Sequence, residues 1–514
     1  MDGKIFMIIL VFNYNMSKEK ENMKGTYFIS SISTTSYLVE YGISSIFTLF
    51  LLFVLDFSIP LTSRVYAYYY GFAFLLPIFV GYLSDKYLNK STSLTIGFLS
   101  LIISQILLWF SASLYDPNNI VRNTIVFNMQ NTVFFIGLLF LALGTSFASL
   151  SITHIINSIN DETSRLKGFS IYYPILNFGI LIGVIITSVV VGDENYELYE
   201  WVFLIFAVIS AIGLASFRLG KGRYLVDNDG NPMRDDHPPN SIRTESNRLL
   251  GKISHKSISK INNLNLRQRI DLFHDSLTSH DKDKLEVFFI FLIVIIFYRI
   301  AYCQTGTSLV FFIDSYVHRD MDIFTIPVQM FSMLNPMFIL ILGPVFIKIN
   351  DKLDEKKIEL DFIKRVVLSL WVLVFCYMLL SVIGYYIDID SVDKISLVWI
   401  ILFEFFLAVS EILFSIASYA MVGDLAPEKY YSLFFGFFLA TRSVAMFLSG
   451  IISSHFPTEE CADFIFNLPV NGLMMFFILF VIMNIFAASL LMIYRKKLMA
   501  KMHPEDNPED ILGH

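Results

Sequence analysis

The sequence predicts an all-α membrane protein with twelve transmembrane helices arranged as two six-helix bundles. Apolar residues make up 55% of the 514-residue chain and charged residues only 16%, whereas soluble proteins carry about 25% charged residues. Twelve stretches are apolar over the length of about 20 residues that a helix needs to cross a bilayer. Six of them precede a polar segment at residues 219–285 and six follow it.

The spans are predicted as helices because unpaired backbone groups are not tolerated in lipid. A barrel would need strands of about ten residues with alternating polarity, a pattern that the chain lacks. The predicted spans cover residues 30–56, 65–84, 93–113, 131–158, 167–191, 200–218, 286–313, 325–347, 365–387, 397–421, 432–454 and 470–494. They divide the chain into a tail (1–29), an N-terminal bundle (30–218), a linker (219–285), a C-terminal bundle (286–494) and a second tail (495–514).

The positions of lysine and arginine predict the orientation. With both termini in the cytoplasm, that side holds 32 of the 38 basic residues, and the outer loops hold four: Arg64, Arg122, Arg319 and Lys394. Without the twelve in the linker, the ratio is 20 to 4. Basic residues accumulate in cytoplasmic loops, so we expect a multi-pass protein of the plasma membrane with cytoplasmic termini.

The polar segments and the cysteines exclude several classes of protein. The linker is expected to be a tether with short surface helices at 253–261 and 264–277; a regulatory domain is the alternative. The three cysteines of the whole chain have no disulfide or zinc-site spacing. With no phosphate-binding loop, metal cluster or nucleophile elbow, we expect no enzyme, cofactor, metal or nucleic-acid partner. Translation from Met1 and from Met16 are both compatible with the sequence.

Local motifs refine this prediction. Two six-helix halves joined by a cytoplasmic loop are typical of the major facilitator architecture. The run Gly81–Lys90 (GYLSDKYLNK) resembles the Gly-x-Leu-x-Asp-Arg motif between helices two and three of that superfamily. By this resemblance Asp85 takes part in gating; the alternative is a solvated charged turn.

Three further runs resemble the proton-dependent oligopeptide transporter (POT) family. Phe169–Gly179 (FSIYYPILNFG) is similar to Phe-Ser-x-Phe-Tyr-x-x-Ile-Asn-x-Gly. In helices seven and eight, Gln304–Leu309 (QTGTSL) and Ile326–Pro336 (IPVQMFSMLNP) are similar to Gln-x-Gly-Ser-Ser-Leu and Ile-Pro…Gln-Ser-Leu-Asn-Pro. In helix ten, Ser410–Pro427 is similar to Gly-Glu-Leu…Met-Val-x-x-Leu-Ala-Pro. The resemblance extends from about residue 36 to 490.

The resemblance implies a monomeric secondary transporter in the lipid bilayer. It would move small peptides or amino-acid-like solutes, with protons as the coupling ion. Several charged family positions are replaced, however. Ser33, Ser36 and Tyr37 stand in the family's Glu-x-x-Glu-Arg motif, Ser44 and Ser149 stand for basic residues, and Cys303 stands for a glutamate. An uncoupled facilitator or exporter of another charged metabolite, and a non-transporting membrane sensor, are the alternatives.

Charged residues inside the spans are candidate site residues, because a charge at the bilayer centre costs about 2.5–3.5 kcal/mol. Glu411 shares a helix face with Ser415 and Ser418, and by resemblance it binds a peptide amino terminus or accepts the coupling proton. Glu40 and Arg299 are expected to form an ion pair across the two halves. Alternatively, Arg299 receives a substrate carboxylate, or the pair is a fixed structural one.

The other candidates are polar residues at positions that the family uses. Tyr41, Asn177, Gln304 and Asn335 complete the predicted substrate site with Glu40, Arg299 and Glu411. An amide can hold a peptide backbone by both donor and acceptor, and it can equally bond a helix kink. Three further residues receive no binding role. Glu404 lies near the outer end of its span, where a gate or snorkelling role and no role are both open. Arg442 is expected to pair with a carboxylate or carbonyls, and His154 to be an interhelical histidine.

Overall fold

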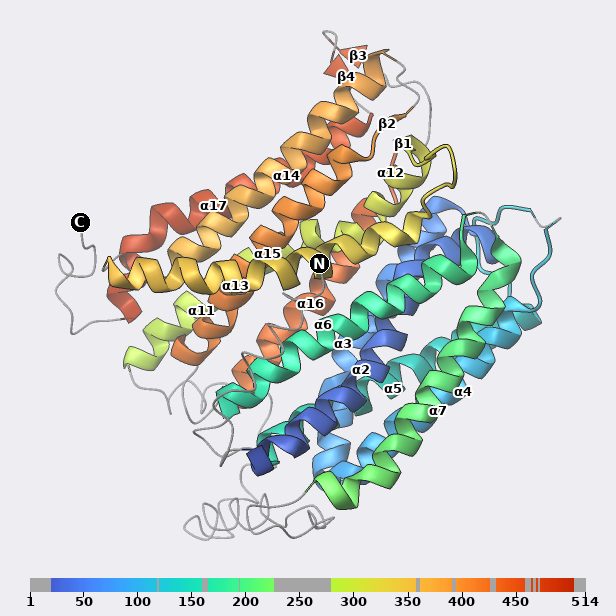
Figure 1. The fold of residues 1–514 in the computed structure, drawn as a ribbon. Coiled ribbons are helices and arrows are strands. Elements are labelled where there is room, and N and C mark those ends of the chain that lie inside the picture. The colour runs from blue at the N-terminus through green and yellow to red at the C-terminus, as the bar shows by residue number, and fades with distance from the viewer. Residues whose placement is uncertain are drawn as a thin grey trace, which may run out of the picture.

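The protein is described from a computed structural model that covers residues 20–117, 120–159, 165–193, 195–225, 279–356, 361–390, 394–425, 431–457, 464–465, 468–469 and 472–502. The predicted linker helices at 253–261 and 264–277 and most of both predicted tails lie outside these residues. Two helical bundles lie side by side, one from each half of the chain (Figure 1).

The N-terminal bundle consists of long helices joined by short turns. In chain order they are α2 (Lys20–Leu49) with its π-helical extension η1 (Phe50–Val54), α3 (Ile59–Tyr87), α4 (Lys90–Ala112), α5 (Met129–Ile159), α6 (Arg165–Val191), the short η2 (Tyr196–Leu198) and α7 (Tyr199–Tyr224). Asn89 caps α4 by accepting a hydrogen bond from the Thr92 backbone N–H at 2.7 Å. Because α4 is capped in this way directly after α3, only two residues, Leu88 and Asn89, separate the two helices.

The C-terminal bundle repeats this pattern with more irregular connections. Its elements are α11 (Ser279–Tyr302), η3 (Cys303–Gly306), α12 (Ser308–Tyr316), β1 (Val317–His318), η4 (Val328–Met333), α13 (Leu334–Glu355), α14 (Phe362–Asp390), β2 (Ile395–Ser396), α15 (Val398–Leu425), α16 (Tyr431–Ser453), β3 (Phe464–Ile465), β4 (Leu468–Pro469) and α17 (Leu473–Met502). The strands β1 and β2 pair in parallel, with Val317 opposite Ile395, and β3 and β4 pair antiparallel.

Ten helical segments of the described chain are long and apolar enough to cross a membrane. The predicted spans 65–84 and 432–454, which are α3 and most of α16, are not among the ten. Tyrosines and polar residues lower the hydropathy of α3. In α16 the apolar stretch, Phe437–Ser453, is shorter than a full membrane span. Several helices also run past their predicted bounds, because helical hydrogen bonding continues through polar flanks that need no lipid.

The predicted span 286–313 lies within one apolar helical segment, Lys282–Tyr316, whose helix geometry changes part-way. The helix breaks at Cys303–Gly306, where a tighter 3₁₀ turn separates α11 from α12. The Thr48 hydroxyl of the N-terminal half donates to the Gly306 carbonyl, so a side chain from the other bundle satisfies a backbone group at the break. Irregular backbone at membrane depth is tolerated where it is buried in protein.

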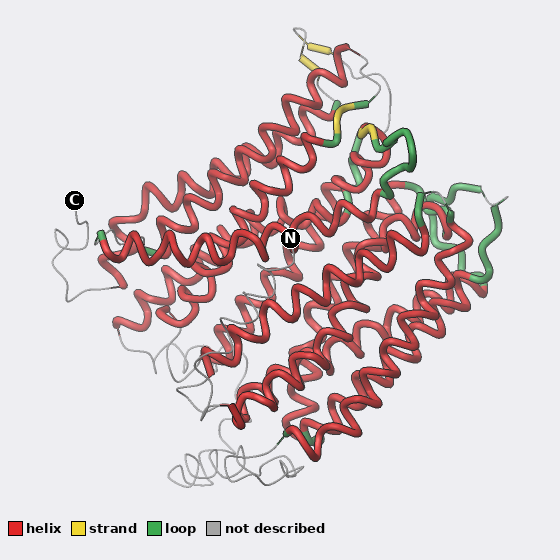
Figure 2. The backbone as a smooth tube through the Cα atoms, viewed as in Figure 1, coloured by secondary structure: helices red, strands yellow, loops and turns green. Residues whose placement is uncertain are grey.

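The bundle has two distinct ends. The loops at residues 55–58, 113–117, 120–128, 192–193, 195–198, 317–327 and 394–397 gather at one end, which we call the loop end (Figure 2). The opposite end, which we call the linker end, holds the C-terminus of α7 and the N-terminus of α11. At the loop end, Arg319 forms an ion pair with Asp193 of the other half, and Gln329 donates to the Gly192 carbonyl at 2.9 Å. These contacts close the loop end across the two halves.

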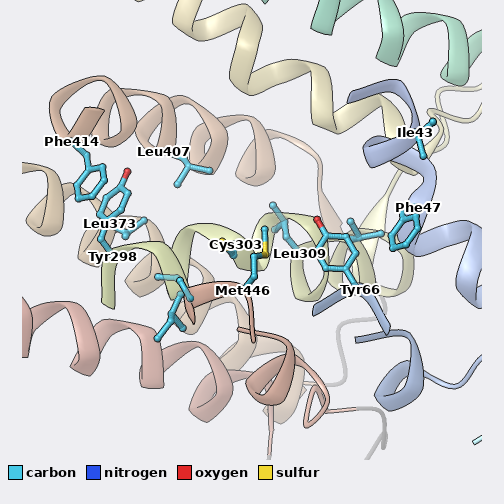
Figure 3. Packing of buried hydrophobic residues seen from close by; sticks show 14 of the residues in the cluster. Ile43, Phe47, Tyr66, Tyr298, Cys303, Leu309, Leu373, Leu407, Phe414 and Met446 are labelled. Atoms are coloured by element: carbon cyan, nitrogen blue, oxygen red, sulfur yellow. The ribbon is translucent and has the colours of Figure 1, made fainter. Parts of the chain in front are cut away.

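Apolar packing continues from one half into the other. Tyr66 and Phe47 of the N-terminal bundle lie close to Leu309 and Cys303 of the C-terminal bundle (Figure 3). Within the N-terminal bundle, α2 and α6 approach so closely at Gly183 that a Cβ there would lie 2.2 Å from the Leu38 carbonyl oxygen. Small residues permit such close helix contacts in membranes. The core is therefore shared by both bundles at their contact face.

Candidate substrate-binding site

Glu411 lies on α15 and is partly buried inside the C-terminal bundle. Its Oε2 accepts a hydrogen bond from the Tyr302 hydroxyl at 2.8 Å. Tyr302 is the last residue of α11, and Thr305 in the following turn donates to its carbonyl at 3.0 Å. The helix break therefore positions the hydroxyl that orients the carboxylate. Among the described residues, no lysine or arginine forms an ion pair with Glu411.

Asn335 lies at the start of α13 and presents its amide to the same carboxylate. Its Nδ2 atom is covered by protein, yet it is not in hydrogen-bonding geometry with any described acceptor. An uncompensated buried amide donor is costly. Its position beside the Glu411 carboxylate offsets that cost, so Asn335 and Tyr302 both orient the carboxylate.

Glu40, Tyr41 and Arg442 converge from opposite halves. Tyr41 lies on α2 within electrostatic reach of Glu40, Arg442 and Glu411. The cation that acts on Glu40 is Arg442 of α16, and no ion pair between Glu40 and Arg299 occurs among the described residues. The predicted Glu40–Arg299 pair is therefore not formed in this structure. Arg442 takes the place that we assigned to Arg299.

Arg299 is instead enclosed by aromatic rings of its own half. Its guanidinium carbon lies 5.9 Å from the centre of the Phe414 ring and 5.4 Å from that of Phe438. Phe414 also stacks on Tyr298 at a ring separation of 3.7 Å (Figure 3). Cation–π contacts of this kind stabilise a buried guanidinium. Arg299 remains close enough to Glu411 for their charges to interact.

Two predicted amides are engaged within their own bundles. The Gln304 Nε2 donates to Ser449 Oγ at 2.9 Å and its Oε1 accepts from Ser308 at 2.5 Å. Asn177 donates to the Tyr173 carbonyl at 2.9 Å, immediately before Pro174. Pro174 lacks the N–H that would bond the carbonyl of Ser170, four residues earlier, so the Asn177 bond to Tyr173 is a local contact beside the proline. Substrate contacts by either amide would have to replace these bonds.

The remaining candidates lie away from this cluster. Asp85 lies in the last turn of α3, and its side chain is outside the described part. Glu404 lies two turns before Glu411 on α15 and is 4% exposed. Ser33 and Ser36, at family positions for charged residues, donate to the carbonyls of Ser30 and Ser33. No cluster of His, Cys, Asp or Glu that could hold a metal occurs in the described residues.

Sequence reasoning missed two members of the cluster, Tyr302 and Phe74, and gave Arg442 no role. The Arg442 guanidinium lies 3.9 Å from the centre of the Phe74 ring, across the interface between the halves. The available signal was that Arg442 and Arg299 are the two lysine or arginine residues that lie well inside predicted spans rather than at a span end. The direction of the Arg442 side chain could not be predicted, because it depends on how α16 is rotated against α3.

A sequence model of the POT family matches residues 92–463, which is most of the chain. The chain belongs to the POT family. The predicted resemblance is thus confirmed. Among curated relatives, dipeptide and tripeptide permease B of Salmonella typhimurium is 23% identical over 452 residues, which cover 84% of this chain and 86% of the relative. The peptide transporter YePEPT of Yersinia enterocolitica is 22% identical, with 77% of this chain and 80% of the relative covered.

Solved structures of POT transporters share the fold. A peptide transporter in complex with alafosfalin superposes with a TM-score of 0.72 at 15% identity, covering 95% of this chain and 100% of that one. A POT family transporter in complex with 5-aminolevulinic acid gives 0.71 at 17% identity, covering 92% and 96%. The predicted major facilitator fold is therefore confirmed. At this identity the likeness establishes the fold and leaves the roles of individual residues to the geometry above.

Proposed function

We propose that this POT family member is a secondary transporter of small peptides or peptide-like amino acids, and that Glu411 binds their ammonium group. The observation that carries the proposal is the environment of the Glu411 carboxylate. Tyr302 orients it by a hydrogen bond, the Asn335 amide lies beside it, and no described cation forms an ion pair with it. A buried carboxylate without a paired cation is costly, so an arriving ammonium group or proton is strongly favoured.

The relatives support this substrate class. Their names are dipeptide and tripeptide permeases, and ligands in the solved neighbours include alafosfalin and 5-aminolevulinic acid. Both the names and the ligands point to small solutes. The proposed role is transport, with no catalytic step.

Transport would proceed by rocking the two halves about this site. We assign the linker end to the cytoplasm from the distribution of basic residues, and we include α3 and α16 among twelve spans. The Asp193–Arg319 pair then lies outside. On this assignment the structure is closed toward the exterior, and Asp85 lies at the cytoplasmic end as a gating residue.

Proton coupling would also depend on Glu411. The carboxylate can alternate between a proton and the substrate ammonium group, since each neutralises it. In the N-terminal half, Ser33 and Ser36 replace the family's charged first-helix residues and make hydrogen bonds within their own helix. That observation favours a gradient-independent facilitator as the second candidate.

Uptake into proteoliposomes separates these functions. We expect labelled dialanine to accumulate in vesicles with an acidic exterior and Glu411→Gln to abolish the accumulation. Glu286→Gln is the matched control, because that half-exposed carboxylate pairs with Lys501 at the linker end. Exchange of dialanine that ignores the gradient would support the facilitator. If no di- or tripeptide is taken up or exchanged, the transport proposal is wrong and a sensor is favoured.

A further inference from the structure

Among the described residues, Glu40 is the charged side chain that the interior of the N-terminal half contributes to the cluster. Serines occupy family positions for basic residues at Ser44 and Ser149. Ser149 donates to the Ser146 carbonyl at 3.4 Å within its own helix. The cations near Glu411 are Arg299 and Arg442, and both belong to the C-terminal half. A substrate carboxylate would therefore meet the cations near Glu411 on that side.

Packing between α3 and α16 fixes the position of Arg442. Ser443 donates to the Gly71 carbonyl across the interface at 2.5 Å. A Cβ at Gly71 would lie 2.7 Å from the Phe447 ring, so a larger residue there would have to displace that ring. Phe74 follows Gly71 by almost one turn, and the Arg442 guanidinium stacks on its ring at 3.9 Å. The guanidinium plane is thereby held by a contact between the halves.

The edge of the Arg442 guanidinium remains available. Among the described residues, no carboxylate forms an ion pair with it, and the acceptor that contacts it is the Tyr41 hydroxyl. Arg442 is only partly buried, and a guanidinium carries five N–H donors, so donors remain beyond the contact with Tyr41. A stacked guanidinium with an open edge presents parallel N–H donors that match the two oxygens of a carboxylate.

We propose that Arg442 is the specificity-determining residue that binds the carboxylate of the substrate, while Glu411 binds its ammonium group. This inference rests on the proposed peptide transport and names the anion-binding residue of the same site. Tyr41 lies within electrostatic reach of both charged groups and would line the space between them. Glu40 acts on Arg442 from the opposite half and would disfavour a second negative charge on the substrate. The selected substrate is a small zwitterion with a free carboxylate.

Competition against labelled dialanine tests this assignment. In the wild type, dialanine should compete about tenfold or more better than dialaninamide, because a bidentate charged pair is lost with the amide. Arg442→Gln should reduce that ratio to about one, and Arg442→Lys should leave a reduced preference, since lysine keeps the charge and loses the planar fork. Arg223→Gln is the matched control: this exposed arginine stacks on Tyr224 at 5.6 Å, at the end of α7.

Each outcome decides a separate point. If the preference for dialanine over dialaninamide is unchanged in Arg442→Gln, the assignment of Arg442 is wrong. The same holds if Arg299→Gln, and not Arg442→Gln, loses the preference. Neither result contradicts peptide transport. If Arg442→Gln does not fold, as judged by gel filtration, Phe74→Leu provides the second variant and should lower the ratio by loosening the guanidinium. An unchanged ratio there overturns the assignment as well. Failure of wild-type protein to take up dialanine contradicts the proposed function itself.

Discussion

The loop-end pair between Asp193 and Arg319 should hold the two halves together, and its removal should open that end. The Arg319 side chain is 8% exposed and that of Asp193 is 23% exposed. Arg319 also donates to the Ile326 carbonyl at 3.0 Å and approaches Asp314 at 3.5 Å. The contact to Asp193 is the one of these that crosses between the halves, so Arg319→Gln removes a link that exists only in the closed arrangement.

The size of the effect follows from this partial burial. Fully exposed pairs contribute about 0.2–1 kcal/mol, and hydrogen bonds to charged groups contribute about 1.5–3 kcal/mol. We expect about 1–2 kcal/mol for this pair, which is roughly a five- to thirtyfold shift in the open-to-closed equilibrium. A shift of that size changes which conformer predominates when the two are within a few kcal/mol.

Spin-label distances between Val121 and Ile323 provide the assay. These side chains are 66% and 91% exposed at the loop end, on opposite halves. A background with Cys461→Ser leaves Cys303 and Cys376, which are buried. Arg319→Gln should add or enlarge a long-distance population. The matched control is Lys501→Gln, which breaks an ion pair to Asp283 and Glu286 within the C-terminal half. Unchanged distances in Arg319→Gln, or an equal shift in the control, would refute the reasoning.

Two further predictions test the packing and the site. Gly183→Val should lower the melting temperature and the expression level, because overpacking costs about 1–3 kcal/mol. The control Gly343→Ala should change little, because no atom lies within 4 Å of its new Cβ. Equal melting temperatures for the two variants would contradict this packing. Tyr302→Phe should raise the half-saturating dialanine concentration about two- to tenfold, since a hydrogen bond contributes about 0.5–1.5 kcal/mol net and this one orients Glu411. The control Tyr377→Phe removes a hydroxyl that donates to the Ala301 carbonyl and should leave the half-saturating concentration unchanged. An equal rise in Tyr377→Phe would mean that loss of any buried tyrosine hydroxyl weakens transport, and not loss of the bond to Glu411.

The fold could be predicted largely from sequence because a bilayer imposes length and apolarity on each span. Where α3 differs from the other spans, the reason is physical. Its tyrosines face protein as well as lipid, with Tyr66 buried and Tyr68 59% exposed, and their hydroxyls lower its hydropathy. The break at Cys303–Gly306 could not be predicted from apolarity, since Thr48 supplies a hydrogen bond there from 258 positions away.

The candidate site was only partly predictable. Glu411 and Asn335 could be found because they stand in family motifs, and the structure brings them together. The cation that lies near Glu40 could not be predicted, because Arg299 and Arg442 are both arginines inside predicted spans and the sequence does not distinguish them. The rotation of α16, fixed by Ser443 against Gly71, places Arg442 at the interface, while Phe414 and Phe438 retain Arg299 inside its bundle. Such choices depend on tertiary packing rather than on local pattern.

The recognition of the substrate amine is the most direct test of the central claim. Counterflow of labelled dialanine and of N-acetyl-dialanine should be measured in vesicles preloaded with unlabelled dipeptide. Wild-type protein should accumulate dialanine and not the acetylated form, and Glu411→Gln should accumulate neither, with an unchanged gel-filtration profile. Equal counterflow of both compounds, or full dialanine counterflow in Glu411→Gln, would contradict the claim that Glu411 binds the ammonium group of a transported peptide.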